Sequence, residues 1–243
     1  RYFDSKVFQN ILMSYENSVK SGHPIFMDAD DLTDIADYYN LIGDTEKAKE
    51  TIDYALEISP AATLPLVFKA REALAKGEHK KAAEYAEQIG DKEDPDYKYL
   101  LAELLIAKNE TEQAESLLEV FFKETSLEER EDFILDAANL YIEYGISDKA
   151  FGWMCKGKRQ NADFKEIMAR TLFGLERYEE SEKLFNELID IDPYSKDYWN
   201  ALANVQLMNE KYEEAITSSE YAIAINPDDA DALLTKANAL YRT

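Results

Sequence analysis

Apolar and polar residues alternate along this chain with the period of an α-helix. In residues 29–60, apolar side chains are spaced three or four positions apart in two successive segments, which places them on one face of each helix. Gly43 and Asp44 separate the segments, and Ser59-Pro60 ends the second, because proline disfavours a helical residue before it. The apolar positions are Leu32, Ile35, Ala36, Tyr39, Ala48, Ile52, Ala55 and Leu56. The pattern predicts a helix, a short turn and a second helix.

This helix-turn-helix pattern repeats along the chain. An alanine in the first helix marks each unit, and successive alanines are 34, 32, 36, 31, 34 and 34 residues apart. They are Ala36, Ala70, Ala102, Ala138, Ala169, Ala203 and Ala237. A second series of small residues follows twelve positions behind, at Ala48, Ala82, Ala114, Ala150, Ser181 and Ala215. A period of this length predicts stacked helix pairs. The units begin near residues 29, 63, 95, 131, 162, 196 and 230.

Small residues at these places have a steric reason. Where two helices cross closely, a large side chain would force their axes apart. We therefore expect the alanines to be buried at helix crossings, with larger residues in the wider gaps: Tyr39, Tyr141, Leu172, Phe185 and Trp199. A residue with a left-handed backbone is expected to end the first helix of most units, at Gly43, Gly77, Asn109, Gly145 and Asn209.

The two ends of the chain depart from the period. Residues 1–28 contain an amphipathic segment that we expect to be a helix ending at Gly22-His23-Pro24 and capping the first unit. A helix that binds a partner is the alternative. Its apolar residues are Val7, Phe8, Ile11, Leu12, Tyr15 and Val19. The array, residues 29–243, ends after the first helix of the seventh unit, so Leu233, Ala237 and Leu240 should be partly uncovered. We expect the natural protein to continue.

The last complete unit, residues 196–229, carries a distinctive set of residues: Trp199, Leu202, Ala203, Tyr212, Ala215, Ala222 and Pro227. These residue types at these positions resemble the tetratricopeptide repeat, including bacterial members of that family without an assigned function. The first unit is similarly close, whereas Phe121 and Gly157 stand where the family usually has alanine. The resemblance implies an all-α fold, a right-handed α-solenoid superhelix of antiparallel helix pairs. It also implies that the first helices line a concave groove, which usually binds a peptide or protein segment.

Fifty acidic against 27 basic residues give the chain a formal net charge of −23. A field of this sign repels phosphate backbones and anionic lipids, so we expect neither a nucleic acid nor a membrane surface as a partner. A basic protein or peptide is the natural partner, although the charge also serves solubility. The single cysteine excludes an internal disulfide. A cytoplasmic location is favoured, and a periplasmic or secreted one would require that an upstream signal had been removed.

The sequence contains no recognisable catalytic or metal-binding motif. His23 and His79 are far apart, and neither has a second histidine, a cysteine or clustered carboxylates at metal-ligand spacing. Cys155 lies in an apolar stretch, where we expect a packed thiol. Aspartates at the second position of most units should complement helix N-termini rather than form a binding stripe. They are Asp30, Asp96, Asp132, Asp163, Asp197 and Asp231. We therefore expect no enzyme, no metal and no cofactor.

The first helices should turn certain positions toward the groove. The ninth positions of the units are Asp37, Arg71, Glu103, Asn139, Arg170, Asn204 and Asn238. Because an asparagine amide both donates and accepts hydrogen bonds, a row of asparagines can bind the main chain of an extended peptide. The alternative is that these polar residues simply face solvent. The predicted peptide-binding residues are Asn139, Arg170, Asn200, Asn204, Asn238 and Arg71, with Tyr99 and Phe173 as apolar anchors.

Acidic residues also collect on the predicted groove face, at Asp34, Asp37, Glu103, Asp136 and Glu166. An extended peptide with a few Lys or Arg residues and one or two apolar side chains would match this surface, with further contacts at Phe68 and Tyr241. The sequence thus predicts a non-catalytic interaction scaffold. Two alternatives stay open. One is a structural module that self-associates through the N-terminal helix or the uncovered last helix. The other is the regulatory region of a longer protein.

Overall fold

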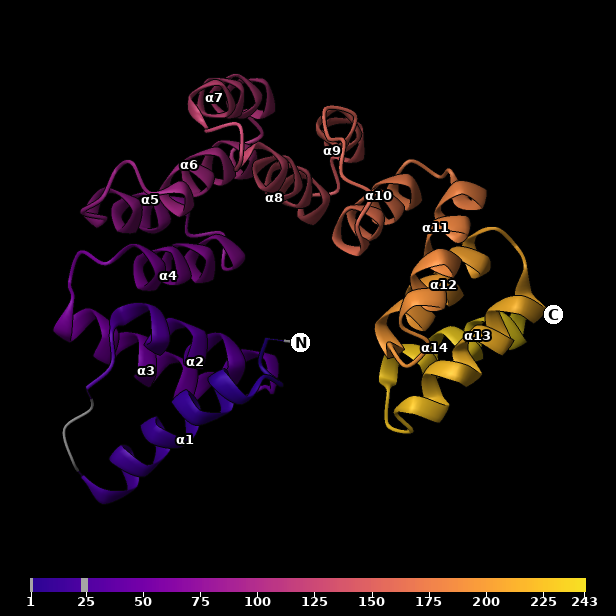
Figure 1. The fold of residues 1–243 in the computed structure, drawn as a ribbon, viewed down its shortest axis with the longest axis horizontal. Helices are drawn as coiled ribbons and strands as arrows, with labels where there is room; N and C mark the ends of the chain where they lie inside the picture. The colour runs from indigo at the N-terminus through magenta and orange to yellow at the C-terminus, as the bar shows by residue number, and fades with distance from the viewer. Residues whose placement is uncertain (1, 23–25) are drawn as a thin grey trace. The chain divides into compact units, whose positions relative to one another are not determined.

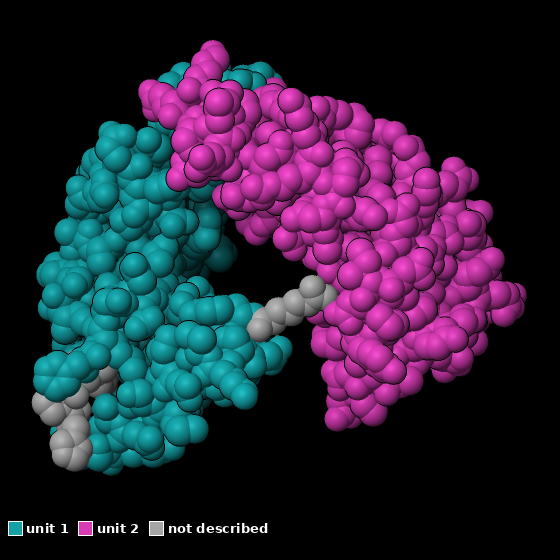
Figure 2. Space-filling model, in the orientation of Figure 1, with its two compact units in different colours: residues 1–121 teal, residues 122–243 magenta. Residues whose placement is uncertain are grey.

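Fourteen α-helices follow one another along the chain in a computed structural model that describes residues 2–22 and 26–243, and these residues contain no β-strand. The sequence-based prediction of an all-α helical repeat is confirmed. The helices belong to two compact units, residues 1–121 and residues 122–243 (Figure 2).

Unit 1 contains the N-terminal helix and the first helix pairs of the array. Its helices are α1 (Lys6–Ser21), α2 (Ala29–Leu41), α3 (Thr45–Ile58), α4 (Thr63–Ala75), α5 (His79–Gln88), α6 (Pro95–Ala107) and most of α7 (Thr111–Glu124), which carries the boundary (Figure 1). Helices α2 and α3 pack as a pair, as do α4 and α5. The first helices of neighbouring repeats also touch, because α4 contacts both α2 and α6.

Unit 2 repeats this arrangement with seven further helices. They are α8 (Arg130–Glu143), α9 (Ser147–Met154), α10 (Ala162–Gly174), α11 (Tyr178–Ile191), α12 (Lys196–Met208), α13 (Tyr212–Ile225) and α14 (Ala230–Arg242). Helices α8 and α9, α10 and α11, and α12 and α13 form pairs. The first helices touch where α8 meets α10 and where α12 meets α14.

Side-chain caps fix where several helices begin. The Asp28 carboxylate accepts the backbone N–H of Asp31 at 2.8 Å at the start of α2, and Asp94, Asn161, Ser195 and Asp229 cap other first helices in the same way. The aspartates at the second repeat position all lie in the first turn of their helices. There they complement the positive end of the helix dipole, as expected.

The turns after the first helices depend on one left-handed residue. Gly43, Gly77, Asn109 and Gly145 have φ of 82°, 73°, 62° and 70°, which confirms four of the five predicted positions. The prediction for Asn209 is wrong, because its φ is −84° and it is only the C-cap of α12. The left-handed residues in the last two turns are Glu176 and Glu210, both with φ of 60°. Each stands seven residues after its repeat alanine, as Gly43 does after Ala36.

The alanines lie where the helices cross. The first six alanines of the leading series are 0% exposed, and the second series is buried throughout. Ser181 replaces an alanine in the second series, and its hydroxyl donates a 2.8 Å hydrogen bond to the carbonyl of Ala169. Of the large residues expected beside them, Tyr39, Tyr141, Leu172 and Phe185 are buried, whereas Trp199 is half-buried and stacks on Tyr221 at 4.4 Å.

Helix α1 covers the first repeat. Phe8, Leu12 and Tyr15 are buried in one core with residues of α2 and α3, and the Tyr15 hydroxyl lies 2.9 Å from Thr51 Oγ1. The helix ends at Gly22, whose φ is 66°; His23 and Pro24 lie outside the described residues. The predicted apolar face was too wide, because Val7 and Val19 are 66% and 55% exposed. Val7 directly precedes Phe8 and lies off the stripe that faces the core, whereas Val19 follows Tyr15 by one turn, near the C-terminal end of α1.

Helix α14 is covered on one side only. Ala232, Thr235 and Ala239 are buried, whereas Leu233 and Leu240 are 48% and 56% exposed and Ala237 is also exposed. These are the three residues expected to be uncovered. In each earlier complete unit, a second helix follows and buries the equivalent alanine.

Candidate functional site

The first helices of unit 1 enclose a pocket of about 340 Å³, here called the α2–α4 pocket. It is lined by Thr33, Asp37, Asn40, Leu64, Val67, Phe68, Arg71, Glu72, Ala75 and Asp96. Two of these residues, Asp37 and Arg71, are ninth-position residues, and Phe68 was expected as an apolar contact. Asp96 was interpreted from the sequence only as a helix-terminus residue, and its position beside Arg71 depends on the stacking of α6 on α4.

Arg71 is held in place by a carboxylate of the next repeat. Its Nε donates a 2.9 Å hydrogen bond to Glu103 Oε2, and Glu103 is only 5% exposed. A buried carboxylate needs such a partner, because removing a charge from water is costly. The ninth-position residues of two consecutive repeats are therefore paired with each other, and Asp37 is the other ninth-position acid.

Acidic residues crowd the α2–α4 pocket. Burial raises the pKa of Asp37 above its ordinary value, the charge of Asp34 adds to this shift, and Arg71 opposes it. Burial and the charges of Asp94 and Asp30 likewise raise the pKa of Asp96, again against Arg71. The single positive charge of Arg71 therefore does not offset the negative charges of the carboxylates around the α2–α4 pocket. A cation that entered the pocket would relieve their mutual repulsion.

The segment before α1 reaches the same face of α2. The Tyr2 hydroxyl donates a 2.7 Å hydrogen bond to Asp34 Oδ2, which raises the pKa of Tyr2 to about 12. The ring of Phe3 lies 4.8 Å from that of Phe8 and 5.8 Å from that of Tyr38. Asp34, expected to face the groove, is therefore already hydrogen-bonded within the chain.

A second pocket, here called the α8–α10 pocket, lies between two first helices of unit 2 and has a volume of about 300 Å³. Its lining residues are Leu135, Asp136, Asn139, Asp163, Glu166, Ile167 and Arg170. Arg170 Nη1 donates to Asn139 Oδ1 at 3.2 Å, and Asn139 Nδ2 donates to Glu143 Oε1 at 3.1 Å. The arginine that interrupts the asparagine row is thus bonded to the asparagine before it.

The other predicted asparagines lie apart from this pocket. Asn204 Oδ1 accepts a 3.0 Å hydrogen bond from the Thr235 hydroxyl, and Asn200 Nδ2 donates to Asp229 Oδ1 at 3.0 Å. Asn200 Oδ1 is buried and accepts no hydrogen bond from the described residues. Asn238 is exposed on α14. The structure brings Asn139 and Arg170 together, and it joins Asn200 and Asn204 to the repeat that follows them.

The predicted apolar anchors are half-buried. Phe173 packs against the core of unit 2, with its ring 5.8 Å from that of Tyr178. Tyr99 lies on α6, and neither residue lines one of the two pockets. Tyr241, named as a further contact, is 92% exposed on α14.

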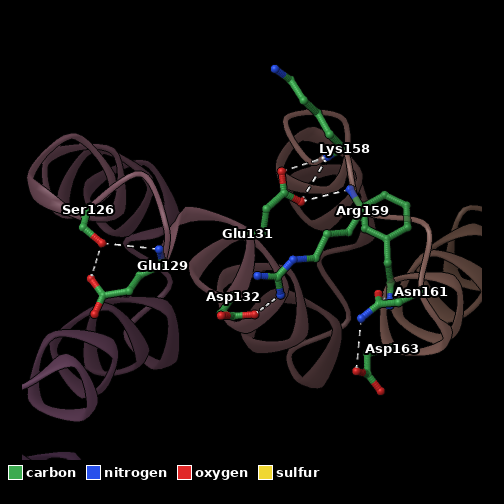
Figure 3. Close-up of polar contacts among 9 residues, drawn as sticks. Ser126, Glu129, Glu131, Asp132, Lys158, Arg159, Asn161 and Asp163 are labelled. Carbon is green, nitrogen blue, oxygen red and sulfur yellow. Dashed lines mark hydrogen bonds and ion pairs between the residues drawn. The ribbon is translucent and has the colours of Figure 1, made fainter.

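A polar cluster that sequence reasoning missed holds the loop between α9 and α10. Both carboxylate oxygens of Glu131 accept the backbone N–H of Lys158 at 3.1 Å, and one also accepts that of Arg159 at 3.1 Å (Figure 3). The Arg159 guanidinium pairs with Asp132 (Figure 3). Helix α9 has only eight residues, whereas α11 and α13 have 14. Glu131 binds the backbone N–H groups of the loop that follows the early end of α9.

The remaining chemistry is sparse. Cys155 is exposed rather than packed, contrary to the prediction, because α9 ends at Met154 and Cys155 is its C-cap. Over residues 2–22 and 26–243, no three His, Cys, Asp or Glu side chains are grouped so that they could hold a metal ion. In the same residues, no helix combines the length and the apolar character that crossing a bilayer requires.

Comparison with known proteins agrees with this geometry. Residues 168–230 match a family model described as the tetratricopeptide repeat. The crystal structure of the APC/C hetero-tetramer Cut9–Hcn1 is similar, with a TM-score of 0.55 and 15% identity over 96% of this chain and 46% of that chain. Yeast Tom70 has a TM-score of 0.57 and 19% identity over 89% of this chain and 47% of that chain. No curated protein sequence matches the chain.

The chain therefore spans about half the length of these two solved structures, and at such identities the likeness is one of fold. The fold is that of a helical repeat protein built from helix pairs. Residues 168–230 carry the match to the tetratricopeptide repeat, the family that the sequence resembles. Proteins built from such repeats generally act as scaffolds that present extended surfaces to other proteins.

Proposed function

We propose that this chain is a non-catalytic scaffold that binds extended peptide segments along its first helices. The observation that supports this most directly is the position of the two pockets. Each lies between the first helices of successive repeats and is lined by ninth-position residues, Asp37 and Arg71 in unit 1 and Asn139 and Arg170 in unit 2. These are the faces on which the sequence predicted a peptide.

The charge of the α2–α4 pocket favours a basic side chain. A Lys or Arg entering it would lie near the carboxylates of Asp37 and Asp96, while Phe68 supplies apolar surface for its methylene groups. The α8–α10 pocket offers the carboxylates of Asp136, Asp163 and Glu166 beside the Asn139–Arg170 pair. That mixture of acceptors and donors suits a peptide main chain and a second basic residue.

A peptide-display selection tests this function. Random peptides are selected on the immobilised chain, on the Asp37→Asn/Asp96→Asn variant and on a Glu57→Gln/Glu87→Gln control. The control removes the same charge from exposed positions of unit 1 outside the pocket. We expect peptides rich in Lys and Arg from the chain and the control, and loss of that preference in the pocket variant. The same peptides from all three proteins would reject the α2–α4 pocket as the binding site.

Self-association through α14 is a second candidate, supported by the exposure of Leu233, Ala237 and Leu240 on its uncovered face. Sedimentation velocity over a range of concentrations would detect it. If this face mediates association, Leu233→Lys/Leu240→Lys should abolish the oligomer. A Leu41→Lys/Leu127→Lys control, at leucines that are 71% and 80% exposed, should leave it intact. A monomer at every concentration would exclude this candidate.

A further inference from the structure

Four lysines converge on a pocket of unit 1 that the sequence did not single out. It has a volume of about 280 Å³ and lies among α3, α4 and α5, and we call it the α3–α5 pocket. Its lining residues are Lys49, Lys69, Glu72, Ala73, Lys76, Glu78, Lys81 and Tyr85. The four lysines outnumber by one the carboxylates of Glu72, Glu78 and Asp53, the ion-pair partner of Lys69, in a chain with a net charge of −23.

One lysine of the pocket is fixed by burial. The Lys69 side chain is 10% exposed, and its Nζ lies 2.6 Å from Asp53 Oδ1. This ion pair holds its ammonium group at a fixed position. Lys49, by contrast, is exposed and has no ion-pair partner in the described part of the chain. The pocket thus combines one fixed positive charge with one that no carboxylate neutralises.

The other two lysines form pairs at the pocket rim. Lys76 Nζ lies 2.6 Å from Glu72 Oε1, and Lys81 Nζ lies 3.1 Å from Glu78 Oε2. These lysine side chains are 56% and 54% exposed. Exposed ion pairs of this kind contribute little to stability, so the lysines can turn to a ligand with a higher charge.

Three lysines of the pocket lower the pKa of one carboxyl group, that of Glu72. The Lys76 hydrogen bond, together with the charges of Lys76, Lys69 and Lys81, lowers the pKa of the Glu72 carboxyl against the opposing effect of its burial. Three ammonium groups therefore stabilise a negative charge at this point. Tyr85 adds a hydroxyl donor to the lining, which an anion can also use.

We propose that the α3–α5 pocket binds a phosphate dianion, either as free inorganic phosphate or as the phosphate of a phosphorylated side chain. The α3–α5 pocket shares Glu72 with the α2–α4 pocket, but its four lysines line neither peptide-binding pocket. Lysine binds phosphate as a point charge, and a dianion gains more from several converging lysines than a carboxylate does. Glu72 competes with such a ligand, because it supplies the carboxylate that these lysines now surround.

Titration with inorganic phosphate, followed by amide chemical shifts at constant ionic strength, tests this site. We expect saturable shifts in α3, α4 and α5, and weakening by about tenfold in Lys49→Glu, which reverses a charge in the lining. Lys108→Glu makes the same charge change at the exposed C-cap of α6 and should leave binding unchanged. Glu72→Gln should tighten binding. Equal affinity in the chain and in Lys49→Glu would overturn the proposal.

Two further experiments distinguish free inorganic phosphate from the phosphate of a phosphorylated side chain. The second pKa of a phosphorylated side chain is about 6, so the affinity of a phosphopeptide should rise between mildly acidic and neutral pH, whereas that of sulfate should not. A phosphoserine peptide that binds more tightly than inorganic phosphate, while its glutamate analogue does not bind, would assign the site to phosphorylated side chains. Equal binding of the phosphopeptide and inorganic phosphate would assign it to the free anion. Binding of the glutamate peptide as tightly as the phosphopeptide would refute a phosphate site.

Discussion

Ala138 and Ala237 occupy the same position in their repeats but have different surroundings. Ala138 is 0% exposed at a helix crossing in unit 2, whereas Ala237 is exposed on α14. We expect Ala138→Leu to lower the free energy of unfolding by about 1–3 kcal/mol, because overpacking forces the helices apart. Ala237→Leu should change it by less than about 0.5 kcal/mol. Urea unfolding of both variants checks this, and equal effects would show that the alanines are not there for steric reasons.

Gly157 stands where the family usually has alanine, and the structure shows why alanine does not fit. A Cβ at Gly157 would lie 2.8 Å from Phe164 Cε2 and 3.5 Å from Glu131 Oε2. We expect Gly157→Ala to destabilise the chain by about 1–3 kcal/mol. Gly152 in α9 is the matched control, because no atom lies within 4 Å of a Cβ added there. Gly152→Ala should stabilise by about 0.5–1 kcal/mol in thermal unfolding. Stabilisation by both changes would contradict this packing.

Residues of the candidate sites were predictable to different degrees. The repeat period indicated that Asp37, Arg71, Asn139 and Arg170 face the same side, because a repeat returns the same position to the same place on its helix. The repeat period could not indicate that Arg170 donates a hydrogen bond to Asn139, since such a pair depends on side-chain rotamers and on the distance between two helices. The lysines of the α3–α5 pocket come from three helices at unrelated repeat positions. No spacing in the sequence connects them.

At the scale of the element, α1 docks through a narrow stripe. Phe8 is 0% exposed, while Val7 beside it is 66% exposed. Phe8→Ala should cost about 3–5 kcal/mol, because it leaves a cavity between α1 and the first repeat. Val7→Ala should cost less than about 0.5 kcal/mol. Thermal unfolding checks both values. A small effect of Phe8→Ala would mean that α1 is not part of the stable core.

The length of helix α9 could not be predicted from the repeat period. The repeat predicts a second helix as long as the others, but α9 ends after eight residues. The Glu131 carboxylate then binds the backbone N–H groups of Lys158 and Arg159. The loop after this early end has backbone N–H groups outside any helix, and these donors need partners. The partner comes from another helix, so local sequence could not reveal it.

At the scale of the whole molecule, the excess of acidic residues affects stability through particular carboxyl groups. The pKa of Asp37 is raised from 3.8, first by burial and then by Asp34, so the native state binds its proton more readily than the unfolded state. This contribution to stability is therefore greatest below pH 3.8 and is lost as the pH rises through the native pKa. Asp37→Asn should stabilise the chain at neutral pH, with the gain vanishing in acid.

Asp44 provides the control of opposite sign. Its hydrogen bond with Lys47 lowers its pKa below 3.8, so its contribution is present at neutral pH and lost as the pH falls. Asp44→Asn should therefore destabilise the chain at neutral pH and have little effect in acid. Urea unfolding midpoints measured across this pH range check both signs. A difference between Asp37→Asn and the unchanged chain that is the same at every pH would contradict the assignment.

The sequence by itself determined the helical repeat and the places of its alanines. Each of these depends on short-range periodicity and on side-chain size, which recur in every unit. The tertiary structure alone decided which carboxylates meet Arg71 and the loop after α9, and where four lysines converge. Those contacts join residues of different helices. Their distances depend on how the helices pack against one another, and no local pattern encodes that packing.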